Sequence, residues 1–307
     1  FSLASRLFVR QSASVGKSVG TLYASNTIGN ILGAFAGGFI LIPLAGIENT
    51  LLVAVMINIA VGGLFLFQSR TLSMTRRGVE AGAAAAVALA AIILMPSWNA
   101  AEMSFGPFYE AMKHSKRIAR SPAELRAIEA ERKVLFHKED VSATVTVKEL
   151  PGGSLTLYTS GKPDASSHGD LPSQELVAHI PLLLHPDPES CLVVGLASGI
   201  SLGSAGRHPL KRMDCVEIVP SMVEAARFFD AYNYRILDDP RVRLIIGDGR
   251  NHLALTDRKY DVIVSEPSNP YIAGVADLFT REYFQLCRDR LTDRGVASLA
   301  ALPLKTL

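Results

Sequence analysis

Glycine and acidic residues follow strand-like hydrophobic runs at several places in the second half of the chain. The first run leads into a Gly-Leu-Ala-Ser-Gly loop at 195–199, and a helix is expected after it. Glycines in such a loop let the backbone approach a ligand, and the helix N-terminus favours polar or anionic groups. The second run ends in Glu217, 22 residues after Gly195, a distance at which an acid accepts hydrogen bonds from both ribose hydroxyls. Asp248 and Gly249 follow the third run, and this aspartate could bind an exocyclic adenine amine.

Glu266 follows a fourth run, near the start of the segment Ser-Glu-Pro-Ser-Asn-Pro at 265–270. Because ligands of open α/β folds bind at the carboxyl ends of the strands, the four segments should lie close together. Their types and their order predict a nucleoside site. They favour an adenosyl sulfonium ligand over a dinucleotide, because the loop lacks the GxGxxG spacing of the dinucleotide fingerprint.

A regular alternation of strands and helices must position these residues. The strand candidates are 191–194, 213–218, 242–246, 260–265 and 296–299. Because helical stretches separate them, they predict a parallel sheet with crossover helices. Upstream, the β-rich runs 143–147 and 155–158 flank a Pro-Gly-Gly turn, which predicts a hairpin. Residues 97–133 are interpreted as a connector with charged, helical stretches.

The first hundred residues differ in character from the rest. Residues 19–42 and 50–67 contain no charge, and each run is long enough to cross a hydrocarbon core of about 30 Å as a helix. A third apolar run, 81–95, is of marginal length. Glycines at positions 29, 33 and 37 recur on one helical face, where a second helix could pack closely.

Basic residues flank these runs and predict their orientation. They are Arg6, Arg10 and Lys17 before the first run, and Arg70, Arg76 and Arg77 after the second. Both clusters should be cytoplasmic. The rest of the chain then lies outside if the third run spans, and in the cytoplasm if it does not. We therefore expect an integral, multi-pass protein of a bacterial plasma membrane, with the side of the second half left open.

Composition excludes two classes of protein. Hydrophobic residues make up 49% of the 307 residues, charged residues make up 20%, and the net charge is +2. Neither a disordered chain nor a basic nucleic-acid binder is expected from these values. The cysteines, at 191, 215 and 287, form no CxxC pair, which argues against a disulfide framework. No metal is expected, because five histidines lack ligand-like spacing: His168, His179, His185, His208 and His252.

Several further motifs extend along the chain. In the second half they lie at 134–136, 178–182, 207–209, 216–218, 239–242, 247–250, 260–270 and 278–279, and in the apolar part at 23–29 and 38–43. Together they resemble the spermidine synthases (polyamine aminopropyltransferases), in the form that is fused to a membrane segment. The resemblance covers nearly the whole chain.

The resemblance implies three parts: transmembrane α-helices within 1–96, a small N-terminal β domain at 134–172, and an α/β domain at 173–307. The last would be a Rossmann-like, methyltransferase-type parallel sheet. The implied reaction moves the aminopropyl group of decarboxylated S-adenosylmethionine to putrescine or a related amine, with loss of methylthioadenosine. Because the chain begins with Phe1 and departs from the family after Leu299, we expect it to be a piece of a longer protein.

The same resemblance implies roles at the site. Glu217 would hold the ribose and Asp248 the adenine amine. The other residues of the nucleoside pocket would be Gly195, Ser198, Gly199, Gly249 and Gln174. Glu266 stands at the position of the family's catalytic Asp, and the residues expected to contact the amine are Asp164, Asp170 and Asn269.

This chemistry requires carboxylates for a physical reason. A primary amine with a pKa of about 10 is protonated at neutral pH and must lose a proton before it attacks. The sulfonium and the second amine group are both cationic, so nearby anions also offset their repulsion.

Departures from the family pattern remove negative charge from the end of the site that should bind the polyamine. Ser198 replaces an Asp of the glycine loop, and Ala197 replaces its middle Gly. Glu266 is one methylene longer than the catalytic Asp, and the neutral Asn269 replaces a second Asp. Ser173 stands where a Tyr is expected.

Two other functions stay open. The first is a methyltransferase that uses S-adenosylmethionine, since 269–271 resembles the Asn-Pro-Pro-Tyr loop of amino-methyltransferases with one Pro missing. The second is a non-catalytic polyamine or nucleoside sensor, or a transport component. Expected partners are a small putrescine-like amine and membrane lipid but no nucleic acid, and a homo-oligomer could form through the soluble domain or the Gly-rich helix face.

Overall fold

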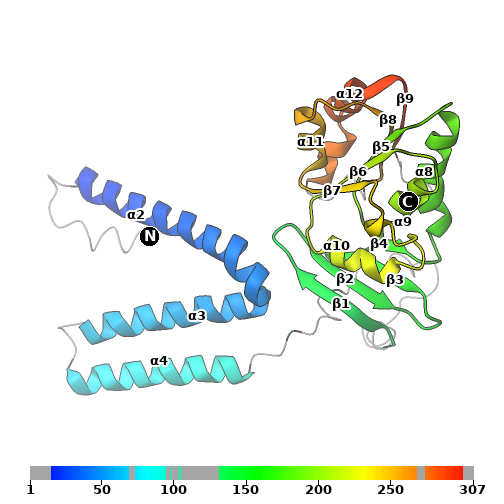
Figure 1. Cartoon of the computed structure of the whole chain (residues 1–307). Coiled ribbons are helices and arrows are strands. Elements are labelled where there is room, and N and C mark those ends of the chain that lie inside the picture. The colour runs from blue at the N-terminus through cyan, green and yellow to red at the C-terminus, as the bar shows by residue number, and fades with distance from the viewer. Residues whose placement is uncertain are drawn as a thin grey trace, which may run out of the picture. The chain divides into compact units, whose positions relative to one another are not determined.

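The computed structural model describes residues 15–68, 73–94, 131–267 and 274–299, together with the single positions Trp98 and Ser104. The chain divides into two compact units, Phe1–Ser97 and Trp98–Leu307, and each has its own architecture (Figure 1).

The first unit is helical. It contains α2 (Val15–Phe35), the π-helical turn η2 (Ala36–Leu41), α3 (Ile42–Gln68) and α4 (Met74–Leu94). The chain breaks direction at Gly46, whose φ of 80° and ψ of 168° are not helical. The turn predicted between the first two apolar runs is therefore a kink at this one glycine, and helix continues on both sides of it. Helices α3 and α4 lie side by side (Figure 1).

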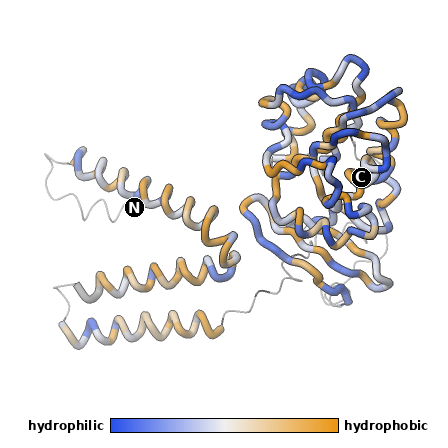
Figure 2. Tube along the Cα trace, viewed as in Figure 1, coloured by the Kyte–Doolittle hydropathy of each residue, from blue (hydrophilic) through white to orange (hydrophobic). Residues whose placement is uncertain are grey.

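The helices of this unit expose apolar side chains. Figure 2 shows hydrophobic residues along most of η2, α3 and α4. Two helical segments, Val15–Phe65 and Met74–Leu94, are long and apolar enough to cross a membrane. A side-chain carbon added at Gly29, Gly33 or Gly37 would meet nothing within 4 Å. The close helix packing expected on this face thus does not occur within the described part of the chain, and membrane insertion stays a prediction.

The second unit begins with an antiparallel sheet. Its strands are β1 (Lys133–Glu139), β2 (Thr144–Glu149), β3 (Leu155–Thr159) and β4 (Lys162–Ser166), paired in chain order. The predicted hairpin is confirmed as β2 and β3, in which Val147 pairs with Leu157. Both side chains are fully buried. They anchor this sheet in the same hydrophobic core as the helices that follow.

A parallel sheet with crossover helices follows, as predicted. Helix α8 (Leu171–Leu184) precedes β5 (Ser190–Val194), and the chain continues through α9 (Ile200–Gly206), β6 (Arg212–Glu217), α10 (Met222–Ala226) and β7 (Val242–Ile246). It ends with α11 (Gly249–Leu255), β8 (Tyr260–Ser265), α12 (Arg281–Asp289) and β9 (Leu291–Leu299), with 3-10 turns at Arg227–Phe229, Ile236–Asp238 and Val275–Phe279.

Within the described residues the strand order of this sheet is β7-β6-β5-β8-β9, with all neighbours parallel. The chain moves outward from β5 in one direction, then returns to β8 and moves in the other. The switch point between β5 and β8 is where open α/β sheets bind ligands, at the carboxyl ends of the strands.

The two faces of the sheet are covered by different helices. One face packs Val193, Cys215 and Val264 against residues of α8, α9 and α10. The other packs Val194, Val216 and neighbouring side chains against α11 and α12. Because side chains alternate along a strand, adjacent residues of β5 and β6 belong to different cores.

Candidate functional site

The loop after β5 has the backbone that its glycines predict. Gly195 and Gly199 have φ values of 94° and 77°, in the left-handed region that side chains disfavour. Ala197 also lies there, with a φ of 46°. Asn233 fixes the loop, because its buried amide donates to the Ser198 carbonyl at 2.9 Å and to the Ala226 carbonyl at 2.9 Å.

Glu217 lies directly beside this loop. Its side chain is buried, with Oε2 accepting the backbone N–H of Leu196 at 2.8 Å and Oε1 that of Val219 at 2.8 Å. Burial raises the pKa of Glu217, and the backbone N–H groups oppose this shift. A carboxylate has about four acceptor sites. The backbone N–H groups of Ala197 and Ile218 also act on this carboxylate, so a ribose hydroxyl would share its oxygens with backbone donors.

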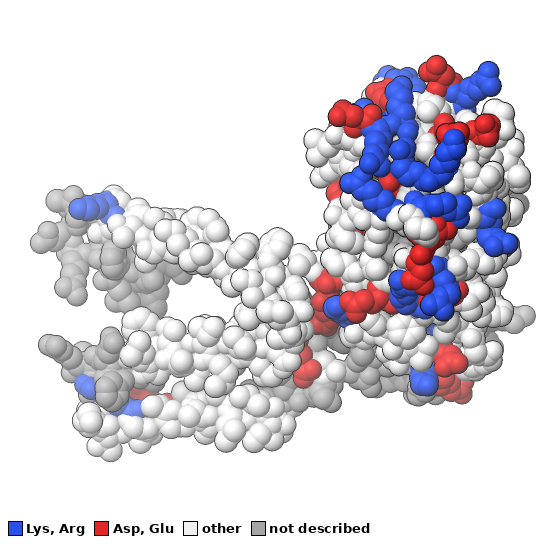
Figure 3. Space-filling view, in the orientation of Figure 1, with Lys and Arg blue, Asp and Glu red and all other residues white. Residues whose placement is uncertain are grey.

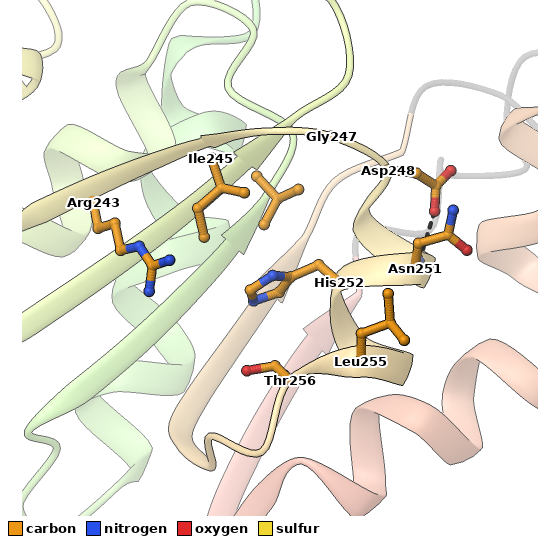
Figure 4. A pocket seen from close by; sticks show the side chains of 9 residues that line it. Arg243, Ile245, Gly247, Asp248, Asn251, His252, Leu255 and Thr256 are labelled. Atoms are coloured by element: carbon orange, nitrogen blue, oxygen red, sulfur yellow. Dashed lines mark hydrogen bonds between the residues drawn. The ribbon is translucent and has the colours of Figure 1, made fainter.

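Asp248 and Gly249 lie at the end of the neighbouring strand β7. Asp248 caps α11, with Oδ1 accepting the backbone N–H of Asn251 at 2.7 Å (Figure 4). A side-chain carbon at Gly249 would lie 2.5 Å from Cγ1 of Val194. The cap thus fixes the position of the carboxylate, and the missing side chain lets α11 approach β5.

Gln174 and Ser198 bond to each other. Ser198 Oγ donates to Gln174 Oε1 at 2.6 Å, and Gln174 Nε2 donates to the Ser166 carbonyl at 3.0 Å. Both side chains are buried. The pair ties the glycine loop to α8 and to the end of β4, so it positions the loop whether or not it also contacts a ligand.

Three carboxylates lie on the other side of the switch point, and we call them the acidic group: Glu266, Asp164 and Asp170. Glu266 follows β8, and its Oε2 accepts a hydrogen bond from Ser201 Oγ of α9 at 2.9 Å. Glu266 is an exposed residue, and its carboxylate is desolvated by nearby protein atoms. This desolvation is the largest cause of its raised pKa, followed by the opposing Ser201 bond and by the charges of Asp170 and Asp164. The three carboxylates therefore act on one another electrostatically.

The two aspartates are held by their own neighbours. Asp164 forms an ion pair with Lys162 on β4. Asp170, just before α8, accepts the backbone N–H of Ser166 at 2.8 Å and also its hydroxyl. Lys162 partly offsets the negative charge of this group, a contribution that the sequence did not suggest. Asn269 lies outside the described residues.

Comparison with known proteins identifies the second unit. Residues 171–303 match the family described as "Spermine/spermidine synthase domain". This part of the chain is thus similar to spermidine synthase domains. It is 33% identical to "Spermidine synthase" of Dictyostelium discoideum over 57% of this chain and 61% of that protein. It is 29% identical to "Polyamine aminopropyltransferase" of Serratia proteamaculans over 53% of this chain and 57% of that protein.

A solved structure agrees. The crystal structure of a spermidine synthase in complex with the transition state analogue AdoDATO superposes with a TM-score of 0.52 at 26% identity, covering 54% of this chain and 57% of that chain. The Rossmann-like, methyltransferase-type fold expected from the sequence is thereby confirmed. The chain spans about half to three fifths of the length of these relatives.

Sequence reasoning missed several contacts of the second unit. Ser201 and Asn233 bond to partners 65 and 35 residues away, and no local pattern marks such pairs. His179 Nδ1 and His208 Nε2 also lie 2.8 Å apart, a contact that joins segments 29 residues apart. Among the described residues, no group of three or more His, Cys, Asp or Glu is arranged to hold a metal ion.

Proposed function

We propose that this protein transfers an aminopropyl group from decarboxylated S-adenosylmethionine to putrescine or a related amine, and that α2–α4 anchor it in a membrane. Two different sets of residues lie at the β5/β8 switch point, and this observation supports the reaction most strongly. A glycine loop with a buried acid lies on one side, and three carboxylates lie on the other.

The glycine loop and the acids beside it have the donors and acceptors that a nucleoside needs. Glu217 offers acceptors for the two ribose hydroxyls, Asp248 offers one for the adenine amine, and the loop at 195–199 brings backbone close to the ligand. These contacts do not depend on the group attached to the sulfur. They hold the donor at its inert end and leave the sulfonium directed at the acidic group.

The acidic group suits a cationic amine. The carboxylate of Glu266 takes a proton from the ammonium group of the acceptor, and its raised pKa makes it a stronger base than a glutamate of ordinary pKa. The amine nitrogen then bonds to the methylene carbon beside the sulfonium. The carbon–sulfur bond breaks, and its electron pair stays on sulfur, giving neutral methylthioadenosine. Asp164 and Asp170 attract the remaining positive charge of the amine.

Donor preference tests the proposal on the full chain in detergent. Titration calorimetry would compare decarboxylated S-adenosylmethionine, S-adenosylmethionine and methylthioadenosine, with and without putrescine. The expected result is preferential binding of the decarboxylated donor, strengthened by putrescine. Preference for the intact donor, or no binding of any of the three to folded protein, contradicts the proposal.

One comparison favours a second candidate, methyl transfer to an amine. "Putrescine N-methyltransferase 2" of Nicotiana tabacum is 29% identical over 59% of this chain and 51% of that protein. That identity equals the one found with the Serratia aminopropyltransferase. Formation of N-methylputrescine from S-adenosylmethionine, measured by mass spectrometry beside spermidine formation, decides between the two.

Membrane anchoring needs its own test. Cell membranes that contain the full chain would be washed at high salt and then at alkaline pH. We expect the chain to stay with the lipid pellet after both washes, because α3 and α4 expose apolar side chains along their length. Release at alkaline pH contradicts the anchor.

A further inference from the structure

A cavity lies away from the acidic group, between α11 and the strands β6 and β7. Its volume is about 360 Å³ (Figure 4). Its lining residues are Val216, Arg243, Ile245, Gly247, Asp248, Asn251, His252, Leu255 and Thr256. Val216 belongs to the core on the α11 face of the sheet, whereas α8–α10 cover the other face. The cavity therefore opens on the α11 side.

A buried aspartate and several arginines lie on the strands beside this cavity. Asp214 is fully buried on β6 and accepts bonds from the Tyr260 hydroxyl at 2.8 Å and from Arg258 at 3.1 Å. Arg212 lies over the Tyr260 ring, 5.9 Å from its centroid, and its buried Nε has no hydrogen-bond partner among the described residues. Arg243 stands opposite Asp214 in the register of β6 with β7, so it is placed near this carboxylate as well.

Arg243 is the arginine that remains available. Within the described residues it forms no ion pair and no side-chain hydrogen bond. Figure 4 shows its side chain extending from β7 on the side of the cavity where His252 and Thr256 lie. Thr256 Oγ1 accepts the backbone N–H of Arg258 at 3.2 Å, so its hydroxyl hydrogen can still be donated. Figure 3 shows Lys and Arg gathered over the part of the domain that contains these strands.

The remaining walls are apolar. Val216 and Ile245 line the sheet side, and Leu255 lines the helix side. A cationic rim beside an apolar wall suits a ligand that combines a doubly charged anion with a short hydrocarbon segment. A phosphate monoester has this form, and Arg binds phosphate oxygens in a bidentate manner.

We propose that this cavity is a binding site for a small phosphate monoester. The phosphate lies against Arg243 and Thr256, and the apolar part of the ligand lies along Val216, Ile245 and Leu255. Asp248 lines the opposite end of the cavity, eight residues before Thr256. At 1.5 Å per residue the helix separates these ends by about 12 Å, so the phosphate lies apart from the adenine contact assigned to Asp248.

Titration calorimetry of the full chain in detergent tests the site, with inorganic phosphate and hexyl phosphate as probes. Both should bind saturably, and hexyl phosphate should bind about tenfold more tightly because its chain covers the apolar wall. Arg243→Gln should weaken both about tenfold, because it removes a charged hydrogen-bond donor. The matched control is Arg288→Gln, whose side chain is 75% exposed on α12, and it should change neither affinity.

Two results would overturn the site: no saturable binding by folded protein, or equal binding by wild type and Arg243→Gln. Competition with methylthioadenosine separates this site from the proposed reaction. Phosphate affinity should not change when methylthioadenosine is saturating. Mutual displacement would make the cavity part of the nucleoside site and overturn the inference, while leaving the proposed reaction intact. Conversely, phosphate binding without binding of any adenosyl ligand would refute the reaction alone.

Discussion

The two halves of the candidate site are built by different means. The nucleoside half is fixed by backbone: the N–H groups of Leu196 and Val219 hold Glu217, and helix capping holds Asp248. In the amine half, one serine hydroxyl holds Glu266 and a lysine pairs with Asp164, while Asp170 accepts both the backbone N–H and the hydroxyl of Ser166. The first half therefore depends on the fold, and the second depends more on individual side chains. The expected departures from the family pattern lie in both halves, with Ala197 and Ser198 in the glycine loop and Glu266 in the amine half.

The largest effect should follow a change in the amine half. Glu266→Gln removes the proton acceptor and keeps the shape, so kcat should fall about 1000-fold while methylthioadenosine affinity stays within about twofold. Glu282→Gln, at an exposed position of α12, is the control. Steady-state kinetics and calorimetry on the same preparations measure the two effects. An unchanged kcat would remove Glu266 from the mechanism.

A change in the nucleoside half should lower the affinity for methylthioadenosine. Glu217→Gln places an amide NH₂ where a carboxylate accepts backbone N–H groups, and methylthioadenosine affinity should fall about 100-fold. Calorimetry measures this, and circular dichroism checks the fold. Glu224→Gln, an exposed position in α10, should leave affinity unchanged. Equal affinities for Glu217→Gln and wild type would contradict the assigned ribose contact.

The pH dependence of kcat tests the role of Glu266 in the amine half. Because burial and two nearby aspartates raise the pKa of Glu266, kcat should fall as the pH decreases through a value above its usual 4.5, where the base becomes protonated. The Ser201 hydrogen bond lowers this pKa. Ser201→Ala should therefore move the acidic limb of the kcat profile to higher pH, with an effect of a few fold near the limb. A limb that moves to lower pH, or does not move, contradicts this arrangement.

The smallest effect concerns the loop itself. Ala197 has a φ of 46°, which costs an L-residue about 1 kcal/mol that glycine does not lose. Ala197→Gly should raise the free energy of unfolding by up to about 1 kcal/mol. Ala178→Gly, in the buried face of α8, should lower it by about 1 kcal/mol or more. Chemical denaturation measures both, and destabilisation by Ala197→Gly would show that the loop is not strained.

Short sequence patterns predicted the elements whose form depends on residues close together in the chain. The hairpin, the parallel strands and the glycine loop all followed from residues close together in the chain. The last strand was predicted at 296–299 but begins at Leu291, because Leu291 also pairs with Tyr260 of β8, before a register irregularity that ends at Val296. The bond between Ser201 and Glu266 and the arginines around Asp214 join distant segments. Only the folded sheet brings them together, so the sequence could not reveal them.

The most direct test of the proposed reaction is turnover. Full-length protein in detergent would be incubated with decarboxylated S-adenosylmethionine and putrescine, and the products would be measured by mass spectrometry. The account predicts spermidine and methylthioadenosine in equal amounts, formed by wild type and lost in Glu266→Gln. Tight binding of methylthioadenosine without any aminopropyl transfer to putrescine or related amines would contradict it.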